Sequence, residues 1–455
     1  MNIYGQESII KHSDVNTRNI DSTYLKYQIQ FDDLNKSRGI NPAEGFYRTN
    51  EITSDKDFAD LLGKLYPSNT GIAIIFYFFQ NDTLKRVLFE PGKVIEVKYI
   101  SITKDEILLW NTKINKSLNL YDLAENRSPI LRGVKVNNPD PKKYDLNETI
   151  KDITDYLLPK SFDEKYKHLI VIPALSIGTI PFQLLRPYKN SSYLIEKCSF
   201  SIAPSITDLI ALRTKVLLKT INSNYYPSSE ATQFKDDSIA LRVHFTFDNP
   251  LFVCNPIYPT NTKYFFPILS GAKREIDNAV KYSEKHILLE DSRATKKNVM
   301  HYLRSCDVAY FATHGISSDT SPMDSSFLVL GGNNDPFLSA KNIMDLRDST
   351  KTKILKFPEM VILSACQTGL GKSMEAGVAG LARSFLIAGS NQVIMSLWSV
   401  DDNATAFLME RFIYHLQTPS LFLPSEQLRQ AILDTRKKYP NPSQWASFSV
   451  FGIDY

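Results

Sequence analysis

Cysteine is scarce in this chain, with four residues among 455. Proteins held together by disulfides carry many more, so the count argues against a disulfide framework and fits a reducing compartment such as the cytoplasm. Cys198, Cys254 and Cys306 lie in or next to apolar stretches, and we expect each to be a small buried side chain. Cys366 differs from them, because small and turn-forming residues surround it.

Long hydrophobic runs are also missing. The longest covers the eight residues 72–79, whereas a helix needs about 20 apolar residues to cross a membrane. The chain does not open with the basic and apolar pattern of a secretory signal. We therefore expect a cytoplasmic protein that is not bound to a membrane.

Neither sign of charge dominates the chain. It has 53 basic and 49 acidic side chains and a net charge of +4, so its composition gives no reason to expect direct nucleic-acid binding. None of the seven histidines is spaced from a cysteine or an acid like a metal ligand. The sequence GLGKS at 369–373 lacks the spacing of a phosphate-binding loop. We expect neither a metal nor another cofactor.

What is present is ample material for a core, since 43% of the residues are hydrophobic and 22% charged. Residues 1–53 are polar and lack periodicity, which predicts an N-terminal leader or docking segment. No 34-residue helical repeat is present. The polar stretch 221–237 predicts a flexible surface loop.

From residue 54 onward, short apolar runs alternate with stretches of helical periodicity. This alternation predicts an α/β fold with a mostly parallel sheet covered by helices. Strands are predicted at 72–79, 87–90, 94–100, 168–173, 251–256, 307–315, 327–332, 360–363 and 393–400. Helices are predicted to begin near 54 and 294 and to cover 104–116, 146–158, 205–218, 273–282, 376–388, 404–416 and 428–437.

Two of these strands end in residues that can carry chemistry. The run DVAYFATHG ends in His314 and Gly315, and the run MVILSACQTG carries Cys366 after its strand. Ligands and chemistry collect at the carboxyl ends of parallel strands, so both side chains are expected over one crevice. A thiol needs a positioned base or imidazolium to become a strong nucleophile. The backbone amides of Gly315 and Cys366 are the predicted oxyanion hole.

The paired motifs FATHG and SACQTG resemble the CHAT domain family, which groups caspase-like cysteine proteases related to separase. Three further segments resemble it: HLIVIP to IPF at 168–182, ILSGAKRE at 268–275, and SLWSVDDNAT at 396–405. The resemblance implies a caspase-like sheet with helices on both faces, preceded by a pseudo-caspase-like α/β half. It divides the chain into a leader (1–53), an N-terminal pseudo-protease half (54–160) and a catalytic half (161–455) with His314 and Cys366.

Simpler interpretations exist for the same residues. A free cysteine is more often a buried core side chain than a nucleophile, but the matching position of His314 favours catalysis by Cys366. Asp401 and Asp402 follow the predicted strand 393–400. One interpretation is a cap for the next helix; the other, implied by the resemblance to separase, is a substrate-binding acid that pairs with a basic residue before the cut.

Two functions from different classes are compatible with these features. The first is a cysteine endopeptidase with a Cys–His dyad that cleaves a specific protein substrate. The resemblance further implies activation by a protein partner or signal in a bacterial immune or cell-death pathway, such as antiviral defence. The alternative is a catalytically silent regulatory or scaffolding protein of the same fold.

Overall fold

The computed structural model describes residues 23–24, 26–27, 52–120, 144–222, 247–260, 262, 264–317, 325–332, 334–346, 357–364, 373–374, 377–378, 380–398, 401–417 and 423–454. Cys366, most of the predicted leader 1–53 and most of the predicted loop 221–237 lie outside these residues. Within the described ranges, no helix is both long and apolar enough to span a membrane.

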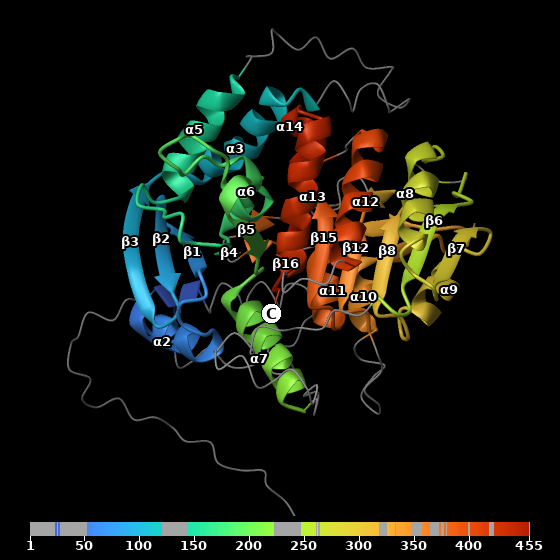
Figure 1. The fold of residues 1–455 in the computed structure, drawn as a ribbon, viewed down its shortest axis with the longest axis horizontal. Coiled ribbons are helices and arrows are strands. Elements are labelled where there is room, and N and C mark those ends of the chain that lie inside the picture. Colours follow the sequence, from blue (N-terminus) through green and yellow to red (C-terminus); the bar gives the residue numbers. More distant parts are fainter. Residues whose placement is uncertain are drawn as a thin grey trace, which may run out of the picture.

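The centre of the molecule is an 11-stranded sheet with the order β3-β2-β1-β4-β5-β16-β15-β12-β8-β6-β7 (Figure 1). Its strands are β1 Ile72–Gln80, β2 Thr83–Glu90, β3 Lys93–Ser101, β4 His168–Ile172, β5 Ser199–Ile202, β6 Leu251–Pro256, β7 Ile287–Asp291, β8 Val308–Ala312, β12 Met360–Leu363, β15 Gln392–Ser396 and β16 Phe448–Gly452. Short strands outside it are β9 Gly315–Ile316, β10 Phe327–Val329, β11 Phe337–Ser339, β13 Ser373–Met374 and β14 Gly377–Val378.

Two parallel blocks make up most of this sheet. One contains β1, β4, β5 and β16, and the other contains β15, β12, β8, β6 and β7. The blocks meet where β16 pairs antiparallel with β15, and β2 and β3 add an antiparallel edge beside β1. The predicted mostly parallel sheet is confirmed. The predicted boundary at residue 160 lies between β1 and β4, which pair with each other, and the division into halves stays a prediction.

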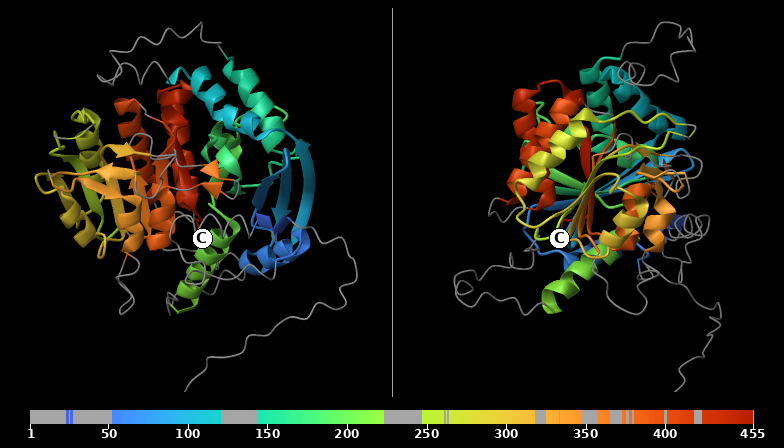
Figure 2. Two further views of the ribbon diagram at one scale, coloured as in Figure 1. Left: turned by 180° about the vertical axis from the view of Figure 1, so that it is seen from behind. Right: turned by 90° about the vertical axis from the view of Figure 1, so that its right-hand side faces the viewer.

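Helices cover both faces of the sheet, as predicted. α8, α12 and α13 lie side by side on one face (Figure 1), and α10 and α11 lie on the other (Figure 2). The helices are α2 Asp55–Leu65, α3 Lys104–Ser117, α5 Leu146–Leu157, α6 Leu194–Lys197, α7 Ile206–Asn222, α8 Ser270–Val280, α9 Lys296–Tyr302, α10 Ala340–Asp345, α11 Leu381–Ala388, α12 Asp402–Gln417, α13 Pro424–Lys438 and α14 Pro442–Trp445, with 3-10 turns at Leu175–Thr179 and Phe182–Leu184.

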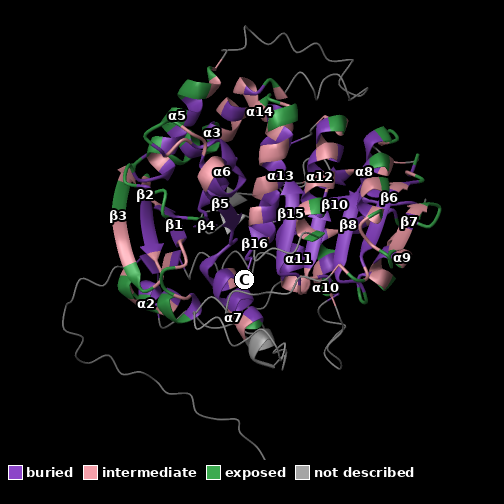
Figure 3. Ribbon diagram, viewed as in Figure 1, coloured by how far each residue is buried: buried purple, intermediate pink, exposed green. Residues whose placement is uncertain are grey.

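Burial on two faces explains why the strands read as continuous apolar runs rather than alternating ones. Every residue of β4, β8, β12 and β15 is buried (Figure 3), as expected for parallel strands under two helical layers. The helix starts follow local capping rules. Ser54 accepts a hydrogen bond from the Asp57 amide, and Thr103 and Glu106 form a capping box at α3.

Several features differ from the sequence-based expectation, and those that concern the main sheet and its longer helices are the following. β16, a central strand, was not predicted, and neither were β5 and β7, because each run is short and its burial depends on distant partners. The helix predicted from residue 376 begins only at Leu381, because Gly377–Val378 pair with Ser373–Met374. α7 extends to Asn222, past the predicted end at 218.

Candidate active site

The strands that lead to His314 and Cys366 are neighbours in the sheet. β8 and β12 pair in parallel with Phe311 opposite Leu363, and the amide of Ser364 donates to the Phe311 carbonyl at 2.9 Å. The polypeptide therefore leaves the sheet at the same edge after β8 and after β12, because the carboxyl ends of parallel strands lie together. His314 lies two residues beyond β8. Cys366, two residues beyond Ser364, lies outside the described residues, so its approach to His314 stays a prediction.

The His314 ring is held by a segment that comes before α8 in the chain. Its Nε2 lies 2.7 Å from the carbonyl oxygen of Pro267. The rings of Tyr258 and Phe266 flank it, with ring centroids 4.9 Å and 5.4 Å away. A carbonyl oxygen can only accept, so Nε2 carries the proton and Nδ1 keeps its lone pair. His314 is thereby fixed in the tautomer of a base.

Burial controls the charge of this imidazole. Packing under Tyr258 and Phe266 lowers the pKa of His314 below its usual value, because burial disfavours the imidazolium, while the bond to the Pro267 carbonyl acts in the opposite direction. The ring is therefore neutral near pH 7. A neutral imidazole with a free Nδ1 is the form that accepts a proton from a nucleophile.

The backbone around His314 is tied into a small second sheet. The hydroxyl of Thr313 donates to the Val329 carbonyl at 2.6 Å and lies 3.3 Å from the Tyr258 hydroxyl. Gly315 opens β9 and pairs with Leu328 of β10. These contacts hold the turn after β8 in place. Gly315 is buried, and its role in an oxyanion hole stays a prediction.

The structure separates the two predicted acids by their contacts. The carboxylate of Asp401 accepts hydrogen bonds from the amides of Asn403 and Ala404, at 3.0 and 3.1 Å. It is therefore engaged as the cap of α12. Asp402 instead faces the start of α8, where the Ser270 hydroxyl lies 3.5 Å from its Oδ2. Of the pair, Asp402 has the carboxylate that is not engaged in capping α12.

Sequence reasoning missed the group that orients His314. It predicted no third residue to accompany His314 and Cys366, whereas the structure places the Pro267 carbonyl 2.7 Å from His314 Nε2. A backbone carbonyl leaves no residue-type signal, since every residue carries one. The only local signal is the run of aromatic residues YFFP at 264–267, whose rings Tyr264 and Phe266 pack on Phe327 and Phe337.

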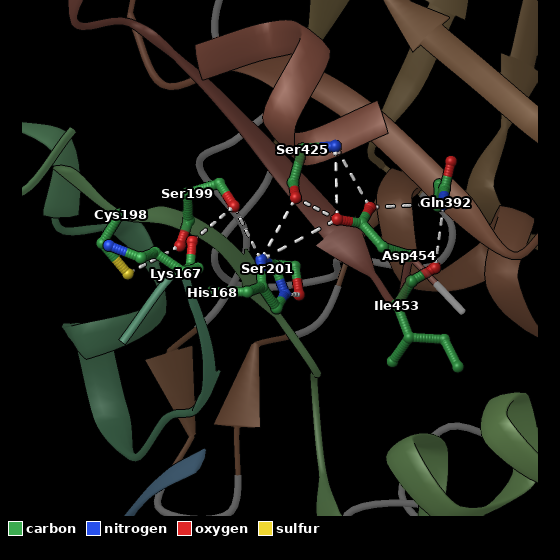
Figure 4. Close-up of polar contacts among 9 residues, drawn as sticks. All are labelled: Lys167, His168, Cys198, Ser199, Ser201, Gln392, Ser425, Ile453 and Asp454. Carbon is green, nitrogen blue, oxygen red and sulfur yellow. Dashed lines mark hydrogen bonds and ion pairs between the residues drawn. The ribbon is translucent and has the colours of Figure 1, made fainter. Parts of the chain in front are cut away.

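A second cluster of polar residues lies in the core, and Figure 4 shows it. The Ser425 hydroxyl lies 3.2 Å from His168 Nδ1 and donates to the Asp454 carboxylate, while Ser199 and Ser201 lie 3.0 and 3.1 Å from the same imidazole. Serine, histidine and aspartate also form hydrolytic triads. Here, however, the serine lies between the other two and all three are buried, at 3%, 3% and 1% exposure.

The charges in this cluster support a structural role. Burial lowers the pKa of His168 to about 3. Burial raises the pKa of Asp454 to about 7, against the opposing hydrogen bonds from Ser425. Both groups are therefore neutral at moderately acidic pH, because burial disfavours the charged form of each. The cluster joins β4, β5, α13 and the residues after β16. No group of three potential metal ligands lies within the described ranges.

Comparison with known proteins places the chain in a family. The family model "CHAT domain" matches residues 147–453. Tetratricopeptide repeat protein 28 of Homo sapiens is 23% identical over 330 residues, which cover 64% of this chain and 12% of that protein. Its Mus musculus counterpart is 23% identical over 331 residues, with the same coverage. The match thus spans only about an eighth of these relatives.

Two solved structures superpose on the chain at low sequence identity. Separase in the Saccharomyces cerevisiae separase–securin complex superposes with a TM-score of 0.50 at 12% identity, covering 87% of this chain and 31% of that chain. The pro- and mature domains of Porphyromonas gingivalis RgpB superpose with a TM-score of 0.42 at 11% identity, covering 77% of each chain. The likeness to separase shows that the fold is caspase-like.

Proposed function

The chain belongs to the CHAT domain family, and from this premise we propose that it is a cysteine endopeptidase with the dyad His314 and Cys366. The observation that carries the proposal is the bond between His314 Nε2 and the Pro267 carbonyl at 2.7 Å. It leaves Nδ1 as a base at the edge of the sheet where the chain continues towards Cys366. A histidine with a purely structural role has no need of a free, directed lone pair.

In the proposed reaction, Nδ1 of His314 removes the proton from the Cys366 thiol, and the thiolate attacks the scissile carbonyl carbon. The carbonyl π electrons move to oxygen, and the amides of Gly315 and Cys366 hold the resulting oxyanion. The tetrahedral intermediate then breaks its C–N bond, and the imidazolium gives its proton to the leaving amine. Water, deprotonated by His314, attacks the thioester and releases the acid and the thiol.

The Pro267 carbonyl contributes at the step where charge develops. The imidazolium that forms on His314 donates its Nε2 proton to this carbonyl, and a hydrogen bond to a charged donor is stronger than one to a neutral donor. The bond therefore stabilises the protonated histidine more than the resting one. Pro267 thus takes the place of the third member that the sequence did not reveal.

We further propose that Asp402 lies in the pocket for the substrate residue before the cut, where it would favour Arg or Lys. Asp401 belongs to the same proposal from sequence, but its capping bonds to α12 make it the weaker candidate. A peptide library with Arg, Lys, Leu, Met or Asp at this position tests the preference. Equal cleavage of all five would remove both acids from the proposed pocket.

The proposed partners are a specific protein substrate and a protein that delivers an activating signal. As the CHAT resemblance implies, we place the enzyme in a bacterial immune or cell-death pathway, such as antiviral defence, acting in the cytoplasm. We propose no metal, no cofactor and no direct nucleic-acid or membrane binding. The genes that neighbour its own would identify candidate activators and substrates for the assays.

The first prediction concerns the dyad. Cys366→Ala and His314→Ala are each expected to lower kcat/KM by at least about 10³-fold, because loss of one member disables the unit. The measurement is cleavage of a candidate protein substrate in the presence of its activator, followed by mass spectrometry of the fragments.

Two substitutions serve as matched controls. Cys198→Ala removes a buried thiol at the end of α6, and His301→Ala removes an exposed imidazole from α9. Both are expected to retain activity. Full cleavage by Cys366→Ala would reject the peptidase, and partner binding without any cleavage would favour the scaffolding alternative.

A further inference from the structure

A carboxylic acid lies buried next to the proposed site and has no role in the dyad. Glu275 belongs to α8 and is 5% exposed. No ion pair to it is formed within the described ranges. Placing a carboxyl group in a core without a counter-charge is costly, and such groups concentrate where a protein uses them. Glu275 therefore needs an explanation.

Two hydroxyl groups hold this carboxyl. The Tyr310 hydroxyl donates to Glu275 Oε1, and Tyr310 is itself fully buried in β8. Ser364, the residue directly after β12, makes the second side-chain hydrogen bond to Glu275. One carboxyl thus connects a helix with two neighbouring strands.

Each of the three connected elements leads to a part of the proposed site. α8 begins three residues after Pro267, β8 ends two residues before His314, and β12 ends at Leu363, directly before Ser364. The start of α8 also packs closely on Asp402. Gly271 leaves no room for a side chain there, since a Cβ added to it would lie 2.7 Å from the Asp402 Cβ. Small relative shifts of such elements misplace catalytic groups and lower the reaction rate.

We infer that Glu275 is a positioning residue, whose carboxyl holds α8, β8 and Ser364 in a fixed arrangement and thereby positions the Pro267 carbonyl and His314, which follow from α8 and β8. The inference rests on the proposed function and deepens it. Glu275 touches no reacting atom; it acts through Tyr310 and Ser364. An ionised carboxylate accepts from both hydroxyls, whereas a protonated one must donate a bond itself.

The protonation state of Glu275 changes near neutral pH. Burial raises the pKa of Glu275 to about 7, the hydrogen bonds from Tyr310 and Ser364 lower it, and the negative charge of Asp402 raises it. Cys254 is a further titratable group that interacts with Tyr310, and burial raises the pKa of both the phenol and this thiol. The arrangement at Ser364 therefore responds to pH near neutrality, while the Tyr310 phenol and the Cys254 thiol stay protonated.

The test compares wild type with Glu275→Gln, a shape-preserving variant that cannot ionise. One arm measures the alkylation rate of Cys366 by iodoacetamide from pH 5 to 9, using mass spectrometry of the labelled peptide. The other arm measures kcat and KM over the same range. We expect an inflection near pH 7 in wild type that Glu275→Gln lacks, and a kcat reduced about tenfold or more with little change in KM.

A matched control and a second variant keep the result decisive. Asp277→Asn changes an exposed acid of the same helix and is expected to leave both profiles unchanged. Tyr310→Phe removes one hydrogen bond that lowers the pKa of Glu275. The inflection in the alkylation and kcat profiles of this variant is therefore expected at higher pH than in wild type. This variant decides the question if Glu275→Gln does not fold.

The two arms separate this inference from the proposed function. Identical alkylation and kcat profiles in wild type, Glu275→Gln and Tyr310→Phe would overturn the positioning role, even in an active peptidase. An absence of cleavage with a pH-dependent alkylation that Glu275→Gln alters would reject the peptidase and retain the link between Glu275 and the chain beyond Ser364.

Discussion

At the scale of single residues, His314 illustrates how a side chain acquires its chemistry from its surroundings. Imidazole titrates near neutral pH on its own. Packing under Tyr258 and Phe266 favours its neutral form, and the Pro267 carbonyl selects the tautomer. The sequence predicted the position of His314 at a strand end. It did not predict these three groups, because they come from a segment about fifty residues earlier.

The support for His314 yields a prediction at this scale. Tyr258→Ala removes a ring next to the imidazole and the contact with the Thr313 hydroxyl. We expect kcat to fall about 10- to 100-fold with KM nearly unchanged, because misplacing a catalytic group costs turnover rather than binding.

Tyr258→Phe is the matched control, since it keeps the ring and loses only the hydroxyl. It is expected to lie within about fivefold of wild type in kcat, because the part-buried contact between the Tyr258 and Thr313 hydroxyls is worth about 1 kcal/mol or less. Steady-state kinetics on one peptide substrate measures both variants. Equal losses in Ala and Phe variants would show that the hydroxyl, and not the ring, supports His314.

At the scale of elements, strand ends were easier to predict than strand neighbours. β8 and β12 are continuous apolar runs, so each can be predicted from its own sequence. Helix caps such as Ser54 can also be predicted, because they depend only on neighbouring residues. β16 has the sequence FSVFG, in which Ser449 lies between two apolar residues. A polar residue between apolar ones suggests a strand with one face in solvent. Here Ser449 is buried instead, because helices cover both faces of the sheet.

The buried cluster around Ser425 leads to a prediction on pH and stability. The pKa of Asp454 is about 7 in the folded protein and near 3.8 when exposed. The folded state therefore binds the extra proton between these values, and the contribution of Asp454 to stability is full below pH 3.8 and is lost as pH rises through 7. His168 acts in the opposite sense, because its pKa falls from 6.5 to about 3.

Asp454→Asn separates the two opposing effects. The free energy of unfolding of the variant, minus that of wild type, is expected to increase by about 3–4 kcal/mol as pH rises from 4 to 8. Urea unfolding at several pH values measures this difference. Asp152→Asn, an exposed substitution on α5, serves as the control. A difference for Asp454→Asn that does not vary with pH would show that Asp454 does not titrate in this window.

At the scale of the whole molecule, one sheet connects segments that the sequence-based division assigns to separate halves. β1, from the predicted N-terminal half, pairs with β4, from the predicted catalytic half, along five residues. The buried residues of both halves form one continuous hydrophobic cluster. A cluster without a break favours cooperative unfolding.

We therefore predict a single unfolding transition for the whole described sheet. Hydrogen exchange measured by mass spectrometry in increasing denaturant is expected to give the same midpoint for peptides from β1 and from β12. Peptides from the exposed edge strand β3 serve as the internal comparison, since local fraying there needs no global opening. Separate midpoints for β1 and β12 would instead support two independent domains at the predicted boundary.

The sequence by itself determined the fold class, the family, the two strand ends that carry His314 and lead to Cys366, and most helices, because these depend on local periodicity, caps and short motifs. Only the tertiary structure decided the oriented tautomer of His314, the burial of the acid Glu275 and the central place of β16. Each of these arises from atoms that are distant along the chain. Burial, hydrogen-bond partners and pKa exist only once those atoms have been brought together.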